Sequence, residues 1–125
     1  ETAHAAFSEV LRRSRERGHT SYLGVLKRHR PDPFLLTHAV DGWSLALDFK
    51  VTPRNRASLW AVTQELTQVV LAAGGRFYFA KDAVIGPDAV RAMYPAGAWE
   101  RFRALKHEVD PEGLLQTDLW RRVTG

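Results

Sequence analysis

Apolar side chains recur every three or four residues along much of the chain, and this spacing is typical of amphipathic helices that bury one face. The pattern predicts helices over residues 3–17, 56–73, 88–93 and 98–109, with one more helical turn in the tail at 112–123. The three long segments are each followed by a stop signal: Gly18, Gly74-Gly75 and Asp110-Pro111.

Shorter segments with alternating or β-prone residues predict strands at 20–28, 42–50 and 76–80. The segment 42–50 alternates most clearly, because Trp43, Leu45 and Leu47 share one face while Ser44 and Asp48 share the other. We expect the apolar face to pack on helices. The small, polar face suits either water or a ligand.

The order helix–strand–strand–helix–strand predicts an α+β fold, a ferredoxin-like split βαβ sheet lacking its first strand. Helices are expected on one face of the sheet, with a helical C-terminal tail. The chain starts with Glu1 and has no initiator Met, which indicates a piece of a longer protein. Another segment of that protein, or a second copy of the chain in a homodimer, would then pair with the open sheet.

Composition places the chain among ordinary folded domains: 125 residues, 45% hydrophobic, with no cysteine and a formal charge of +4. No apolar run approaches the roughly 18 residues needed to cross a bilayer, so we expect no transmembrane segment. A cytoplasmic location is predicted, and the excess of arginine and lysine is compatible with peripheral contact with a membrane.

Phosphate-binding and nucleophile motifs are absent from the sequence, and the spacing of the histidines predicts no metal site. Lys27 and Lys81 each close a helix–glycine–strand–lysine unit, and Ser44 lies on the strand between the two units. Two lysines above a polar floor suit an anionic or hydroxyl-rich ligand; the alternative is that both are solvated at the sheet edge. Tyr78 and Lys81 can serve one site only if the chain bends near Ala80.

Several motifs together resemble the C-terminal part of FAD-linked oxidases of the vanillyl-alcohol oxidase superfamily, and the decaprenylphosphoryl-ribose oxidase group above all. The resemblance extends over nearly the whole chain. The motifs are Gly18-His19-Thr20-Ser21-Tyr22-Leu23 before Lys27, Gly42-Trp43 through Asp48-Phe49, GGRFYFAKD at 74–82, Ala92-Met93-Tyr94-Pro95, and Lys106 through Asp110-Pro111 with Thr117-Asp118-Leu119 and Arg121-Arg122.

The resemblance implies that residues 1–125 are a C-terminal substrate or cap domain, and that a missing N-terminal domain binds most of the FAD. Lys81 matches a lysine close to both flavin and substrate and is therefore the expected catalytic residue. Tyr78 matches an aromatic residue lining the pocket, and both Lys81 and Tyr78 are expected to contact the flavin. Lys27 and Ser44 match substrate-binding positions. The ribose oxidases have asparagine and cysteine where this chain has Ser44 and Ala46, so the substrate is expected to differ.

The implied activity is that of an enzyme, an FAD-dependent oxidoreductase that oxidises a hydroxyl of a sugar-like or polyol substrate by hydride transfer to the flavin. We expect the chain alone to be inactive and to bind FAD weakly or not at all.

Two other functions compete with the oxidase interpretation. The run Phe77-Tyr78-Phe79 superficially resembles an RNA-recognition sheet, but its aromatic rings alternate between faces and a stacking platform needs them on one face, which disfavours RNA binding. A dimerisation module, in which the open sheet pairs with another copy, is the second alternative.

Overall fold

The computed structural model describes residues 1–124 and confirms an α+β fold with a small sheet. One antiparallel pair of strands and five helices make up this part of the chain. In order they are α1 (Thr2–Glu16), β1 (Leu23–His29), β2 (Gly42–Asp48), α2 (Arg56–Ala72), α3 (Pro87–Met93), α4 (Ala98–Val109) and α5 (Asp118–Thr124).

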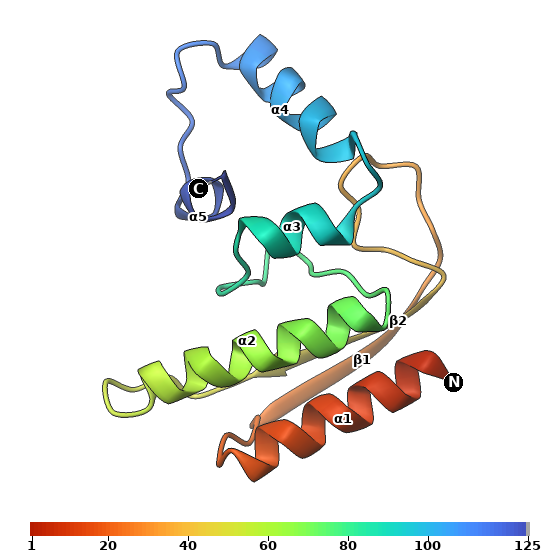
Figure 1. The fold of residues 1–125 in the computed structure, drawn as a ribbon, viewed down its shortest axis with the longest axis vertical. Helices are drawn as coiled ribbons and strands as arrows, with labels where there is room; N and C mark the ends of the chain where they lie inside the picture. The colour runs from red at the N-terminus through yellow and green to blue at the C-terminus, as the bar shows by residue number, and fades with distance from the viewer. Residues whose placement is uncertain (125) are drawn as a thin grey trace.

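The two faces of the sheet differ as the alternating pattern predicts. Leu47 of β2 packs into a cluster formed by Val10 of α1 with Val62 and Leu66 of α2, so the helices cover the apolar face. Figure 1 shows α1 and α2 running side by side in opposite directions along the β1–β2 pair. The opposite face, which carries Ser44, is left free of these helices.

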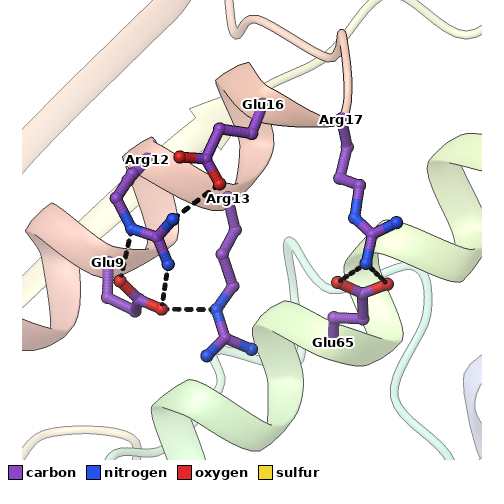
Figure 2. Close-up of polar contacts among 6 residues, drawn as sticks. All are labelled: Glu9, Arg12, Arg13, Glu16, Arg17 and Glu65. Carbon is purple, nitrogen blue, oxygen red and sulfur yellow. Dashed lines mark hydrogen bonds and ion pairs between the residues drawn. The ribbon is translucent and has the colours of Figure 1, made fainter.

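Charged side chains decorate the α1–α2 pair but contribute little to its stability. Glu9 accepts hydrogen bonds from Arg12 and Arg13 on its own helix, which lower its pKa to about 2. Arg17 pairs with Glu65 of α2 at 2.9 Å (Figure 2). Because these groups are exposed, water screens each pair, and the apolar contact holds the helices together.

A second core fastens the C-terminal half of the chain. Ile85 and Val90 are completely buried there. Burial also raises the pKa of the Tyr94 hydroxyl to about 12. The remaining members come from α3, α4 and α5: Ala89, Met93, Trp99 and Val123. The tail helix returns to α3 after the loop that follows α4, as Figure 1 shows, and thereby closes this core.

The end of α4 is held by one buried carboxylate. Asp110 accepts hydrogen bonds from the Lys106 ammonium and from the backbone N–H groups of Leu114 and Leu115, the latter two at 2.8 and 3.0 Å. The Lys106 hydrogen bond, with smaller help from the two amides, lowers the pKa of Asp110. The chain can therefore turn after α4 and lead into the tail helix.

The strand predicted over residues 76–80 is not formed. This segment is tied to α3 instead of the sheet: the Phe77 N–H donates to Met93 Sδ at 3.1 Å, and Phe77 and Phe79 pack into the C-terminal core. The prediction of a second helix–glycine–strand–lysine unit is therefore wrong. The ferredoxin-like arrangement stays a prediction, because the sheet of residues 1–124 consists of two strands that follow each other in the chain.

A turn replaces the end of that strand. The N–H groups of Lys81 and Asp82 both donate to the Tyr78 carbonyl at 3.0 Å. The chain thus bends at Ala80, which is the condition that the sequence set for Tyr78 and Lys81 to serve one site.

Among residues 1–124, no helix is long and apolar enough to cross a membrane.

The glycine pair after α2 leads into this turn, and each glycine is needed for a different reason. Gly74 has a φ of +69°, which favours glycine, whereas a Cβ on Gly75 would lie 2.7 Å from Val70 Cγ1 and 2.9 Å from the Val70 carbonyl oxygen. Gly75 therefore lets the chain pass close to the last turns of α2.

Gly75→Ala is expected to lower the free energy of unfolding by about 1–3 kcal/mol, because the backbone oxygen of Val70 cannot move aside. Urea denaturation measures this change. Gly24→Ala in β1 is the control, since its Cβ would meet only Leu47 Cδ2 at 3.6 Å. Equal midpoints for the two variants would contradict the steric role of Gly75.

Candidate functional site

The pairing of β1 with β2 places two predicted site residues side by side. Lys27 lies directly opposite Ser44 in the register. Side chains at directly opposite positions project from the same face with Cβ atoms about 4.5–5.5 Å apart. Because the helices pack on Leu47 and hence on the other face, the Lys27 ammonium and the Ser44 hydroxyl share the face left open.

A histidine that the sequence analysis did not select completes this polar face. His29 lies two residues after Lys27 on β1, and its Nε2 is 2.7 Å from the Ser44 hydroxyl oxygen. The two-residue spacing from Lys27 along the strand was a usable signal, because side chains at i and i+2 share a face. The hydroxyl of Ser44 is thereby held by a titratable ring.

Contacts between aromatic rings connect this face to Tyr78. The His29 and His38 rings meet edge to face with centroids 5.0 Å apart, and the His38 ring lies 4.5 Å from the Tyr78 ring. Burial, and secondarily the proximity of His29, lowers the pKa of His38. The long loop between β1 and β2 therefore carries a ring that links His29 to Tyr78. No sequence pattern pointed to His38.

A hollow of about 410 Å³ opens beside the His38–Tyr78 contact. The Asp32 carboxylate shapes its rim by accepting from the Thr37 hydroxyl at 2.8 Å and from the Phe34 N–H at 3.0 Å. The walls are largely aromatic: Phe34, Leu36, Thr37, His38, Phe77, Tyr78 and Phe79, with Asp32. A similar hollow of about 440 Å³ beside α1 contains none of the predicted site residues.

Lys81 lies on the turn that begins at Tyr78, and its side chain is exposed. Within residues 1–124, no hydrogen bond joins its ammonium group to Lys27, Ser44 or Tyr78. Convergence of the two ammonium groups therefore stays a prediction. His29 and His38 connect Ser44 to Tyr78, and Lys27 lies opposite Ser44 in the strand register. Lys81 follows Tyr78 by three residues in the sequence.

The turn that carries Lys81 is fastened to the tail helix by a buried ion pair. The Asp82 carboxylate, 4% exposed, accepts from Arg122 of α5 at 3.0 Å and from the N–H groups of Val84 and Ile85 at 3.2 and 3.3 Å. Arg122 also donates to the Asp82 carbonyl at 3.2 Å. The position of Lys81 thus depends on a helix about forty residues further along the chain.

The described residues include side chains that can bind an organic ligand, but no cluster that can hold a metal ion. In the part of the chain from 1 to 124, no group of three or more metal-ligating side chains is arranged to hold a metal ion. The polar groups present are the Lys27 ammonium, the Ser44 hydroxyl, the imidazoles of His29 and His38 and the Tyr78 phenol, with the Asp32 carboxylate at the rim of the hollow. These groups can bind and orient a hydroxylated or anionic ligand and can move a proton.

Comparison with known proteins supports the family resemblance that the sequence motifs suggested. No family model matches the chain. It is 36% identical over 115 residues to an uncharacterized protein in the mprA 5' region of Streptomyces coelicolor, which covers 91% of this chain and 30% of that protein. It is 34% identical over 119 residues to decaprenylphosphoryl-β-D-ribose oxidase of Mycolicibacterium smegmatis, which covers 94% of this chain and 24% of the oxidase.

These matches confirm the resemblance to the ribose oxidase group. The chain spans less than a third of the length of either relative.

Asp82→Asn is expected to lower the free energy of unfolding by about 1–3 kcal/mol, because it leaves the Arg122 guanidinium without its counter-charge. Arg122 Nη1 is already buried with no hydrogen-bond partner among the described residues. Urea denaturation measures the free energy of unfolding. Hydrogen exchange should also become faster at the Val84 and Ile85 amides, and mass spectrometry measures this exchange.

The matched control is Asp88→Asn, since Asp88 is fully exposed and pairs with Arg91 at 2.8 Å on the surface of α3. This control should cost less stability than Asp82→Asn, because water screens the exposed pair. If the two variants unfolded at the same urea concentration, the ion pair between Asp82 and Arg122 would not be what fastens the turn.

Proposed function

We propose that this chain is the C-terminal substrate domain of an FAD-dependent oxidoreductase that oxidises a hydroxyl of a sugar-like or polyol substrate. The observation that carries the proposal is the open polar face of the β1–β2 pair, where Lys27 lies opposite Ser44, in a chain that matches a ribose oxidase over 94% of its length. An ammonium beside a hydroxyl can donate to and accept from the same carbinol oxygen.

The ammonium and phenol groups of this chain fit a flavin as well as a polyol. Lys81 and Tyr78, which the family resemblance assigns to the flavin, supply an ammonium and a phenol from one turn, and these groups suit a ring system that gains negative charge when reduced. The face with Lys27 and Ser44 is not covered by α1 or α2, so another domain can approach it. When bound, FAD would supply the acceptor for the hydride.

The chain's own side chains would divide the remaining tasks. Lys27 and Ser44 would bind the hydroxyl groups of the substrate, and Tyr78 would line the pocket beside the aromatic hollow. Lys81 would stabilise negative charge that develops during the reaction or orient the reacting hydroxyl. Because Ser44 and Ala46 differ from the ribose oxidase pattern, the floor of the pocket would accept a substrate other than that of the ribose oxidases.

Pairing with a second copy of the chain is the alternative that a structural feature favours. Both strands of a two-stranded sheet have an unpaired edge, and such edges recruit further strands. In the oxidase proposal, an N-terminal domain occupies this position. Stacking on RNA loses support, because Phe77 and Phe79 pack into the core and Tyr78 alone of the three rings is exposed.

The complete polypeptide that contains this chain is expected to purify with FAD and to lose the flavin's visible absorbance when mixed anaerobically with a suitable polyol. Lys81→Met should lower kcat/KM by about 100-fold or more, as the loss of one charge-stabilising donor does elsewhere. Stopped-flow spectroscopy measures the reduction step directly.

Lys50→Met is the control, because Lys50 is an exposed lysine just beyond β2. It should react like the wild type. A complete polypeptide without flavin would overturn the proposed function, and equal rates for the two lysine variants would remove Lys81 from the reaction.

The 125-residue chain by itself is expected to retain no flavin after desalting, since the missing domain would make most of the contacts. Absorbance spectroscopy and analytical ultracentrifugation of the purified chain test this expectation together with the dimer alternative. A flavin spectrum that survives desalting would contradict the proposed division between two domains. A stable dimer would favour pairing through the open strand edges.

A further inference from the structure

We propose that Ser44 and His29 form a proton relay that removes the hydroxyl proton of the substrate. The inference rests on the proposed alcohol oxidation and extends it, because oxidising an alcohol to a carbonyl requires an acceptor for that proton as well as one for the hydride. The acceptor would be His29 Nε2, which the substrate reaches through the Ser44 hydroxyl.

The contact between Ser44 and His29 can conduct a proton in one of its two possible arrangements. At 2.7 Å, one hydrogen lies between the Ser44 oxygen and His29 Nε2. If the neutral ring carries its proton on Nδ1, then Nε2 accepts and Ser44 donates. The lone pairs of Ser44 are then free to accept a proton from a ligand. Among residues 1–124, the His29 ring is the hydrogen-bond partner of this hydroxyl.

Lys27 gives the ligand its second point of attachment. Its position opposite Ser44 allows its ammonium to donate to a carbinol oxygen whose own hydrogen points at Ser44. An adjacent positive charge favours the developing alkoxide character of that oxygen. Lys27 would therefore assist the departure of the proton, while Ser44 passes it on.

His38 keeps the relay from acquiring a second charge. Its ring lies edge to face against His29 at 5.0 Å, and its pKa is lowered first by burial and then by His29. Both effects disfavour a positive charge on the His38 ring. The charged or titratable groups around the His29 ring are Lys27 on the same strand face, His38 against the ring, and Asp32 and Tyr78 beyond His38.

Arg28 adds no free charge to this group. It lies on the opposite face of β1, donates to the carbonyl of His29 and pairs with the Asp41 carboxylate.

The step balances as follows. The carbinol carbon loses its hydrogen together with two electrons to an oxidant of the flavin class, so the carbon is oxidised and the C–O single bond becomes C=O. The hydroxyl proton moves to the Ser44 oxygen while the proton of Ser44 moves to His29 Nε2. Ser44 is thereby restored, and His29 leaves the step as an imidazolium. Its partly exposed ring then returns the proton to solvent.

The first test needs only the 125-residue protein and measures the tautomer of His29. Ring nitrogen chemical shifts in a ¹⁵N-labelled sample at alkaline pH should show an unprotonated Nε2 in a hydrogen bond and a proton on Nδ1. Ser44→Ala should change the Nε2 signal, because the hydrogen bond is lost. A proton on Nε2 in the wild type would make Ser44 the acceptor and overturn the relay.

Ser58→Ala is the matched control for the tautomer measurement. Among residues 1–124, Ser58 makes the other contact between a serine hydroxyl and a histidine ring, with its oxygen 3.1 Å from His19 Nε2. This substitution should alter the signals of His19 and leave those of His29 unchanged.

The second test uses the complete polypeptide and its dependence on pH. In the wild type, kcat/KM should fall toward acid pH as His29 takes up a proton and stops accepting. His29→Phe should lower kcat/KM by about 10²–10⁴-fold and abolish this acid limb, since a positioned proton acceptor contributes about that factor. Ser44→Ala should act in the same direction, and His107→Phe, on the exposed side of α4, should match the wild type.

The outcomes separate this inference from the function on which it rests. Alcohol oxidation with an unchanged acid limb in His29→Phe overturns the relay alone. Absence of alcohol oxidation by the wild type overturns the proposed function and the relay with it. In that case the tautomer measurement still shows whether Ser44 donates to His29.

Discussion

The register of the β1–β2 pair is the constraint on which the candidate site depends. It places Lys27 opposite Ser44 and brings His29 to the same open face, while Leu47 points into the cluster between α1 and α2. A slip by one residue would exchange the two faces, burying the ammonium under the helices and exposing the leucines. The apolar contact with Leu47 therefore orients the polar groups on the other side.

A second, independent core holds the other half of the site. Phe77 and Phe79 pack against α3, and Tyr78 between them points out toward His38. The buried pair of Asp82 with Arg122 then fixes the turn that carries Lys81 to the tail helix. Residues from β1, β2, the loop between them and the segment after α2 meet in this way, although no single segment contains them all.

The polar face differs from a solvated rim, because its serine has a specific partner. Ser44 would be an ordinary surface serine if it lacked a partner, but a histidine ring holds its hydroxyl at 2.7 Å and a second ring links that histidine to Tyr78. Each of these contacts restricts the orientation of the rings. This order distinguishes the face from the arginine-rich side of α1, where exposed pairs are screened by water.

The sequence by itself determined the helices, the two alternating strands and the division of the sheet into an apolar and a polar face, because these depend on local spacing and glycine or proline stops. It also indicated Lys27, Ser44 and Tyr78. The tertiary structure decided that residues 76–80 do not form a strand, since the strand propensity of Phe77 and Phe79 was outweighed by burial in the C-terminal core. It alone brought His38 and Arg122 to the site, because such long-range contacts leave no periodic trace in the sequence.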